Sequence, residues 1–315
     1  MKSRNKMNRK VCFIGLGSIA ARHIKNLKDI FGEKIEIDVF RSGTGKTLDD
    51  NLQSMIGQVY FDYNSLPKEY DVMFVTNPTR LHYETLQKVQ DYAKHFFIEK
   101  PVFETGIEDL AKLQLKKDSV YYVASPLRYT NVIQYLKENI DFNQVYSMRC
   151  ISSSYLPDWR PGTDYRNTYS AKKELGGGVS IDLIHEWDYI CYLAGQPIKV
   201  HSFIGHKSNL EIDSDDLAVY IAEYPDKFVE LHLDYLGRKS IRKIELFTQN
   251  DSIEADLIEQ KIVFRKDNRI IDLKEDRDSY QKKELFHFFD IVEGKCENDN
   301  TIESACQTLR ITRGE

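Results

Sequence analysis

Cysteine is scarce in this chain, and its spacing argues against two kinds of site. The 315 residues include five cysteines, an odd number spread from Cys12 to Cys306 with no C-x-x-C pair. A disulfide framework or a zinc site is therefore not expected, and we predict no metal site. Scattered reduced thiols are typical of cytoplasmic proteins, so we expect the chain to be cytoplasmic.

Long apolar runs and a strong excess of one charge are missing too. No stretch approaches the roughly 20 apolar residues that span a bilayer. No apolar segment follows the basic start of the chain, so we expect neither a membrane protein nor a secretory signal. A net charge of −5 gives no electrostatic reason to expect nucleic acid or an anionic membrane as a partner. With 41% hydrophobic and 30% charged residues, a chain of this length fits two globular domains.

Short apolar runs alternate with amphipathic segments over about the first 125 residues. This alternation is the pattern of β-α-β units, whose parallel strands are buried. Thr105 and Glu108 form a capping-box pattern, which predicts a helix with Ile107, Leu110 and Ala111 facing inward. Strands are predicted at 11–14, 35–40, 71–75, 95–98 and 120–124.

The chain after this region has a different pattern, with strand candidates that follow one another. Phe228–Tyr235 alternates polar with apolar residues, as in a sheet with one solvated face. We place the domain boundary at Ser125-Pro126, because proline does not fit a central strand. The fold class is α/β, with an N-terminal domain over 1–125 and a C-terminal α/β domain over 126–315 that contains an open, mostly antiparallel sheet. Strands are predicted at 145–155, 198–205, 217–224, 228–235, 241–248, 252–257, 261–265 and 270–273, and helices at about 179–193 and 280–293.

A glycine-rich turn connects the first predicted strand to the first predicted helix. Residues 15–20 form a G-x-G-x-x-A run. Gly15 permits a tight turn, Gly17 lets the backbone approach a pyrophosphate, and Ala20 is small enough for close helix–strand packing. The helix N-terminus adds free N–H groups and the positive end of its dipole. This run predicts dinucleotide binding by a Rossmann-type domain, with contacts from Gly15, Gly17, Ser18, Ile19 and Ala20.

The end of the second predicted strand bears on the choice between NAD and NADP. An acid there binds the ribose 2′-hydroxyl when NAD is preferred. This strand is instead followed by Arg41 and Ser42, with Lys46 close by in the sequence. A cation and a hydroxyl suit a 2′-phosphate, so we predict NADP, with Arg41 and Ser42 as contacts. NAD is the alternative if Arg41 is only a solvated loop cation.

Lys100 is the first candidate catalytic residue. It lies in the segment Glu99-Lys100-Pro101, directly after the strand predicted at 95–98. Ligands of open α/β sheets bind outside the carboxyl ends of the strands, so Lys100 is expected to meet the nicotinamide or the substrate. A lysine there can donate to the reacting oxygen and stabilise the negative charge that develops on it.

A second candidate group follows a run of three glycines. Residues 176–178 precede a predicted helix on which Asp182, His185 and Asp188 recur three apart, on one face. A histidine flanked by carboxylates suits a general base, because the acid fixes its tautomer and stabilises its charged form. A solvated polar face is the alternative explanation for this fragment taken alone.

As an ordered set, these motifs resemble the glucose–fructose oxidoreductase, inositol dehydrogenase and MocA family over nearly the whole chain. Asn77-Pro78 with His82, and Arg128-Tyr129, match it further. The resemblance implies a Rossmann domain joined to an α/β domain whose open sheet forms a homodimer or homotetramer. It also implies an NAD(P)-dependent dehydrogenase or reductase that interconverts a secondary alcohol and a ketone on a sugar, sugar derivative or sugar nucleotide.

The resemblance also implies roles for individual residues. Lys100 matches the active-site lysine, Asp182 the helix carboxylate, and His185 the histidine that exchanges the hydroxyl proton. The family usually spaces the acid and the histidine as D-x-x-x-H, whereas here they are three apart, so Asp188 or Glu186 is an alternative partner. The implied cofactor-binding residues after the strands predicted at 71–75 and 95–98 are Thr76, Asn77, Pro78, His82, Glu99 and Lys100.

A long aromatic stretch, 155–169, leads into the three glycines and carries two arginines. Such loops can close over a substrate, and arginine binds a carboxylate or phosphate with two hydrogen bonds. The stretch resembles the version in family members associated with surface sugars, which favours an acidic sugar or a sugar nucleotide. An arm that packs on a neighbouring subunit, with Trp159 as its anchor, is the alternative. The candidate substrate-binding residues are Arg128, Trp159, Arg160, Tyr165, Tyr169 and His185.

Two other functions fit the same pattern. One is a non-catalytic sensor that binds NADP and a sugar, since a fold does not fix a function. The other is a reductase of a non-sugar double bond, which would not require the lysine and the histidine. Lys100, Asp182 and His185 favour the sugar enzyme, because a sensor has no need of groups that transfer protons.

Overall fold

A computed structural model describes residues 8–43 and 50–315, and these residues divide into two compact units. The first contains the described part of Met1–Ala124 together with Gln281–Cys306. The second contains Ser125–Tyr280 together with Gln307–Glu315. The chain passes from the first unit to the second between Ala124 and Ser125. The segment Gln281–Cys306, which lies in the predicted C-terminal domain, groups with the first unit.

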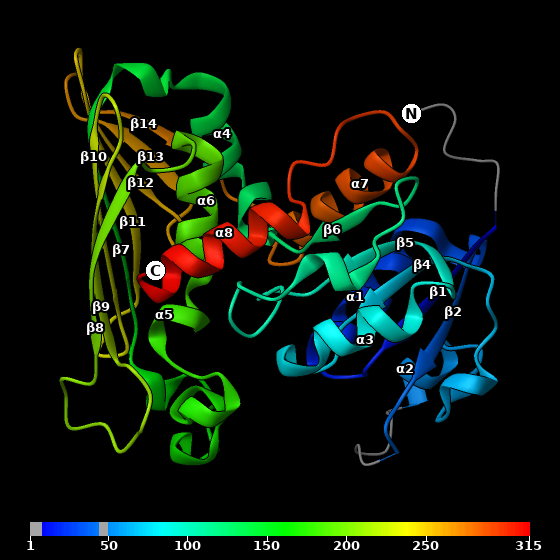
Figure 1. Ribbon diagram of the computed structural model, residues 1–315. Helices are drawn as coiled ribbons and strands as arrows, with labels where there is room; N and C mark the ends of the chain where they lie inside the picture. The colour runs from blue at the N-terminus through cyan, green and yellow to red at the C-terminus, as the bar shows by residue number, and fades with distance from the viewer. Residues whose placement is uncertain (1–7, 44–49) are drawn as a thin grey trace. The chain divides into compact units, whose positions relative to one another are not determined.

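The first unit is built on a six-stranded sheet in the order β3-β2-β1-β4-β5-β6 (Figure 1). Every neighbouring pair is parallel, as the sequence predicts for a Rossmann-type domain. The strand order reverses between β1 and β4, and ligands of such sheets bind at this switch point. The elements are β1 (Arg9–Ile14), α1 (Ser18–Phe31), β2 (Ile35–Phe40), α2 (Asp50–Ser54), β3 (Val59–Tyr60), β4 (Tyr70–Val75), α3 (His82–Val89), β5 (Ala93–Ile98), β6 (Tyr121–Val123) and α7 (Ser279–Val292).

The helix predicted after Thr105 is absent, although its capping contacts form. The main-chain N–H of Thr105 donates to Oε1 of Glu108 at 2.8 Å, and that of Gly106 donates to Oε2 at 2.7 Å. Gly106 has a φ of +83°, which a right-handed helix does not allow at its first position. The contacts therefore close a loop, Ile107 is exposed, and only a short 3-10 helix, Leu110–Leu113, follows.

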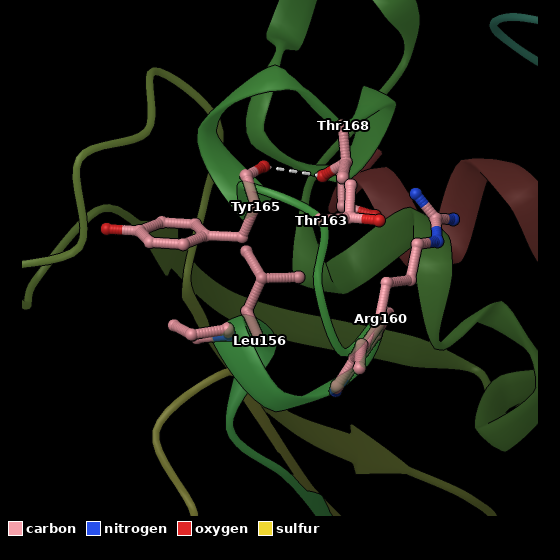
Figure 2. Close-up of a pocket in the computed structure, with 8 residues that line it drawn as sticks. Leu156, Arg160, Thr163, Tyr165 and Thr168 are labelled. Atoms are coloured by element: carbon pink, nitrogen blue, oxygen red, sulfur yellow. Dashed lines mark hydrogen bonds between the residues drawn. The ribbon is translucent and has the colours of Figure 1, made fainter.

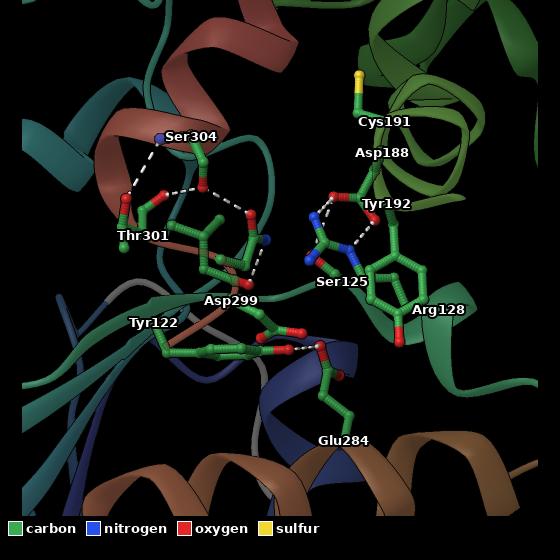
Figure 3. A network of polar contacts seen from close by, with 12 residues as sticks. Tyr122, Ser125, Arg128, Asp188, Cys191, Tyr192, Glu284, Asp299, Thr301 and Ser304 are labelled. Atoms are coloured by element: carbon green, nitrogen blue, oxygen red, sulfur yellow. Dashed lines mark hydrogen bonds and ion pairs between the residues drawn. The ribbon is translucent and has the colours of Figure 1, made fainter. Parts of the chain in front are cut away.

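Aromatic packing explains why the segment 281–306 belongs to the first unit. Phe288, on α7, is fully buried, and its ring lies 5.3 Å from that of Phe97 and 6.2 Å from that of Phe74. Tyr122 on β6 donates a hydrogen bond to Glu284 of the same helix, as Figure 3 shows. The same segment also pairs with the edge strand β6. The Asn300 carbonyl accepts a hydrogen bond from the N–H of Val123, and the Asn300 side-chain amide donates one to the Val123 carbonyl.

The second unit is built on an eight-stranded sheet in the order β14-β13-β12-β11-β7-β10-β9-β8. Only β7 and β10 pair in parallel, so the sheet is mostly antiparallel, as predicted. Helices α4 and α6 cover one face (Figure 1). The elements are α4 (Asn131–Asn139), β7 (Val145–Ser153), α5 (Val179–Asp182), α6 (Ile184–Ala194), β8 (Lys199–Gly205), β9 (Leu217–Glu223), β10 (Phe228–Asp234), β11 (Ile241–Thr248), β12 (Ser252–Asp256), β13 (Lys261–Phe264), β14 (Arg269–Asp272) and, across the boundary between the units, α8 (Ile302–Arg313).

The single helix predicted over 179–193 is two helices. The chain leaves helical geometry at Leu183, where φ is −99° and ψ is +29°, and α6 begins at the next residue. Leu183 itself is buried in the core of the unit. As a result, Asp182 ends α5 and His185 lies in the first turn of α6, so the two do not share one continuous helical face as predicted.

The two faces of the second sheet differ in character. Leu231 and Leu246 point into the core under the helices and are fully buried. On strands of the same sheet, Phe203 is 75% exposed and Phe228 is 60% exposed. Among the described residues, no helix is both long and apolar enough to cross a membrane.

Because Phe288 packs in the core of the first unit, its truncation should destabilise that unit. Phe288→Ala should reduce the free energy of unfolding by about 3–5 kcal/mol, because it leaves a cavity among aromatic rings. Hydrogen exchange should quicken in β4 and β5, whereas the control Leu231→Ala should quicken exchange in β7 and β10. Loss of protection in the second sheet after Phe288→Ala would contradict the assignment of this segment.

Candidate functional site

The ends of β1 and β4 meet at a glycine. Gly15 has a φ of +93°, and a Cβ there would lie 2.7 Å from the Cα and the N of Asn77. The Thr76 hydroxyl donates to the carbonyls of Ile14 and Gly15, at 3.1 and 2.9 Å. The first glycine of the run is therefore required both by its backbone conformation and by close contact with the neighbouring turn.

The N-terminus of α1 is open to an anion. Gly17 precedes the helix without a side-chain cap, and no acidic residue lies in the first turn. Apart from Gly17 and its two neighbours in the chain, no described residue has an atom within 4 Å of where a Cβ of Gly17 would stand. Ser18 is exposed, Ile19 is half-buried and Ala20 is fully buried against the sheet. Free N–H groups and an unobstructed approach fit the pyrophosphate of a dinucleotide.

The end of β2 carries the predicted cation and hydroxyl. Arg41 is half-buried and Ser42 is exposed, directly after the strand. Asp38, the acid within β2, is buried and accepts hydrogen bonds from the Tyr70 hydroxyl at 2.8 Å and the Gln58 N–H at 2.9 Å. The Asp38 carboxylate therefore makes hydrogen bonds inside the first unit, in place of a bond to a ribose. Lys46, noted in the sequence, lies outside the described residues.

His82 joins two loops at the carboxyl edge of the first sheet. It is 1% exposed, its Nε2 lies 2.8 Å from the Asn77 carbonyl, and its Nδ1 lies 3.1 Å from the carbonyls of Pro101 and Val102. Burial lowers the pKa of His82. Both ring nitrogens of His82 thus contact main-chain carbonyl groups. Pro78, which precedes His82 by four residues, is exposed.

Glu99 reaches back to a residue that the sequence analysis did not select. Its Oε1 lies 2.6 Å from Nε2 of His23 on α1, and its Oε2 accepts from the N–H of Lys100 at 3.3 Å. Burial by itself would raise the pKa of Glu99, but the hydrogen bond from His23, followed by nearby positive charge, lowers it. The only sequence signal for His23 is a polar residue three positions after Ala20, on a helix face that is mostly apolar.

Two of the three glycines before α5 are required by close contacts. A Cβ on Gly177 would lie 2.0 Å from the carbonyl oxygen of Tyr169. Gly178 has a φ of +132°, and its Cβ would lie 2.2 Å from Oδ1 of Asp215. Oδ2 of the same Asp215 accepts from the N–H of Ser180 at 2.8 Å, so this carboxylate satisfies the start of α5.

Asp182 lies at the other end of α5, among tyrosine side chains. It is 7% exposed, and the Tyr235 hydroxyl donates to its Oδ2 at 2.6 Å. Burial, and then the Asp182 carboxylate, raise the pKa of both Tyr235 and Tyr169, so both phenols keep their protons. Burial also raises the pKa of the neighbouring Asp215. The Asp182 carboxylate thus accepts a hydrogen bond from a neutral phenol.

Asp188 has a different partner. It accepts two hydrogen bonds from Arg128, from Nε at 2.9 Å and Nη2 at 2.7 Å, and one from the Ser125 hydroxyl at 3.2 Å (Figure 3). Arg128 is 5% exposed, and its guanidinium also lies 5.0 Å from the ring centre of Tyr192. This geometry gives Arg128 a structural contact with α6, and its contact with a substrate stays a prediction.

Glu186 likewise forms an ion pair with an arginine. It is fully buried on α6, and its Oε1 lies 2.7 Å from Nε of Arg242 on β11. Of the three acids considered as partners of His185, Asp188 and Glu186 therefore each have an arginine, while Asp182 has tyrosine. His185 itself is half-buried in the first turn of α6.

The aromatic stretch forms a small pocket in the second unit. Figure 2 shows Arg160 on one side of it, and Leu156 and Tyr165 on the other. The Trp159 indole donates to the Ser154 hydroxyl at 2.9 Å, and the Arg160 guanidinium lies 5.2 Å from the ring centre of Tyr169. Three of the predicted substrate residues thus come together, while Tyr169 lies by Asp182. The pocket is lined by Leu156, Pro157, Trp159, Arg160, Thr163, Tyr165, Thr168 and Ser170.

Two family models together match most of the chain. Residues 9–125 match the model described as "Oxidoreductase family, NAD-binding Rossmann fold". Residues 133–254 match the model described as "GFO/IDH/MocA C-terminal domain". The two matches fall in the first and second units in the order in which the sequence motifs occur.

Individual relatives are distant. YrbE of Bacillus subtilis (strain 168), described as an uncharacterized oxidoreductase, is 25% identical over 191 residues. That match covers 59% of this chain and 53% of YrbE, so the chain spans about half the length of this relative.

Solved structures resemble the chain over almost its full length. Levoglucosan dehydrogenase in complex with NADH is 18% identical, with a TM-score of 0.82 over 98% of this chain and 96% of that one. UDP-N-acetylglucosamine 3-dehydrogenase from Acidithiobacillus ferrooxidans is 17% identical, with a TM-score of 0.77 over 98% of this chain and 96% of that one. At these identities the likeness establishes the shared fold.

Proposed function

Because the chain belongs to the GFO/IDH/MocA oxidoreductase family, we propose that it is an NAD(P)-dependent dehydrogenase or reductase. It interconverts a secondary alcohol and a ketone on a sugar, a sugar derivative or a sugar nucleotide. The observation that carries this proposal is the tight glycine turn at Gly15 followed by the uncapped start of α1, at the switch point of the first sheet. This arrangement fits the pyrophosphate of a dinucleotide.

The chain's own groups then have separate roles. The bound nicotinamide supplies or accepts the hydride. His185 takes the hydroxyl proton in oxidation and returns it in reduction. Asp182 accepts a hydrogen bond from the Tyr235 hydroxyl, and a carboxylate there favours the protonated form of a nearby imidazole. Lys100 donates to the reacting oxygen and stabilises negative charge on it.

A test of these roles compares three variants of the second unit. His185→Ala and Asp182→Asn should lower kcat, the former by about 10²–10⁴-fold, while the affinity for the dinucleotide is kept. Asp188→Asn should instead lower thermal stability, because it disturbs a buried ion pair. The assay would follow NADPH fluorescence with a panel that includes levoglucosan and UDP-N-acetylglucosamine, the sugars named for the two structural relatives.

Different outcomes separate the alternatives. If only Asp188→Asn abolishes turnover by folded protein, the assignment of Asp182 is wrong. If no sugar is turned over while the dinucleotide binds, a sugar-binding sensor of the same fold is favoured.

NADP is the proposed cofactor, with NAD as the alternative. Arg41 and Ser42 directly follow β2, where a carboxylate would select NAD. The acid inside the strand, Asp38, is occupied by Tyr70 and Gln58 and does not change this preference.

Calorimetric titration tests the cofactor. NADPH should bind more tightly than NADH, and Arg41→Ala should remove about tenfold or more of that difference, because it deletes a charge-assisted contact to the 2′-phosphate. Lys117→Ala, an exposed cation elsewhere in the first unit, is the matched control. Equal affinity of the unmodified protein for both dinucleotides would remove the NADP preference.

We further propose that the open face of the second sheet joins two or four copies of the chain. Phe203 and Phe228 are exposed there, and large apolar side chains gathered on a surface mark association sites. Sedimentation velocity should show a dimer or tetramer that Phe203→Asp with Phe228→Asp dissociates. The control Ile107→Asp alters an exposed apolar residue of the first unit and should change nothing. A monomeric unmodified protein would refute this proposal.

A further inference from the structure

We propose that the hydrogen bond between His23 and Glu99 is a positioning device, which ties the turn carrying Lys100 to the helix that receives the dinucleotide. The role of Lys100 in this inference rests on the proposed function. His23 is a positioning residue here, because it acts through Glu99 and not on the substrate.

His23 has one evident partner in an apolar setting. Its side chain is 1% exposed, and its ring lies 5.2 Å from that of Phe97 and 6.2 Å from that of Phe74. A polar ring buried between aromatic side chains requires a hydrogen bond to offset its lost hydration. Nε2 meets this need at Glu99, whereas Nδ1 has no hydrogen-bond partner among the described residues.

The Glu99 carboxylate connects two parts of the unit. Its lowered pKa keeps it ionised, so it can only accept, and Nε2 of His23 must donate. Its second oxygen accepts from the N–H of Lys100 at 3.3 Å. One carboxylate therefore binds both a side chain of α1 and the main chain at the proposed catalytic lysine.

The turn is also held on its far side. His82 lies 3.1 Å from the carbonyl oxygens of Pro101 and Val102. The backbone of Lys100 is thus bracketed by two buried imidazoles, His23 before it and His82 after it. Fixing the main chain on both sides restricts where the lysine ammonium can reach.

Helix α1 transmits this restraint to the cofactor end of the unit. It begins at Ser18, directly after the open glycine turn, and His23 lies five residues further along. At a rise of about 1.5 Å per residue, the Cα of His23 stands roughly 8 Å along the axis from the start of the helix, and its side chain tilts back toward that end. A shift of the helix start on dinucleotide binding would therefore move Glu99 and the turn with it.

Hydrogen exchange of the turn tests this inference without a known substrate. His23→Leu removes the donor, and His23→Gln keeps an N–H near the position of Nε2. Leu27→Ala is the matched control, because Leu27 is fully buried on the same helix and its truncation destabilises the unit without touching Glu99. Exchange at Lys100 and Val102 would be followed with and without NADPH, together with the Kd of NADPH.

The expected pattern separates positioning from general destabilisation. His23→Leu should quicken exchange at Lys100 and Val102 by at least about tenfold relative to β4, because a charge-assisted hydrogen bond is lost. NADPH should protect these amides in the unmodified protein and in His23→Gln, but not in His23→Leu. Once a substrate is found, His23→Leu should lower kcat by roughly 100-fold with KM little changed.

Two results would overturn the inference. One is unchanged exchange at the turn in His23→Leu. The other is an increase that is uniform over the unit and equal to that of Leu27→Ala. If the unmodified protein fails to bind NADPH, the proposed function fails, while exchange without cofactor still tests the bond itself.

Discussion

Close approach of neighbouring atoms to the main chain, possible only at glycine, is the constraint on which both candidate sites depend. In the first unit, Gly15 lets β1 end against the turn at Asn77. A side chain there would displace the start of α1, and with it every group that the helix carries. In the second unit, Gly177 and Gly178 let the aromatic stretch and Asp215 abut the start of α5. The position of Asp182 follows from those contacts.

Buried acids of the molecule are distinguished by the kind of donor that each one meets. Asp188 and Glu186 face arginine, which neutralises them and holds α6 in place. Glu99 faces a histidine, whereas Asp182 faces a tyrosine. A phenol lowers the cost of burying a carboxylate without cancelling its charge. Asp182 therefore differs from Asp188 and Glu186 in having a phenol as a hydrogen-bond donor.

Much of the architecture follows from periodicity and glycine spacing in the sequence. Buried runs predicted most strands of the parallel sheet, and alternation predicted the strands of the antiparallel one. The capping pattern at Thr105 misled, because Gly106 adopts a positive φ that local pattern does not reveal. Partner choice was not predictable at all: His23 and Glu99 are 76 residues apart, and nothing local shows that they meet. The same holds for Arg128, whose partner Asp188 lies 60 residues along the chain.

Placement of Gln281–Cys306 in the first unit has a consequence for synthesis of the chain. As the protein leaves the ribosome, every strand of the first sheet emerges before Phe288, which completes its aromatic core. The strands of the second unit all emerge in the interval. The apolar surface that Phe288 covers on the first sheet therefore stays exposed until nearly the whole polypeptide has been made. A chaperone that shields nascent chains would therefore bind the first unit, because that unit is translated first but completed late.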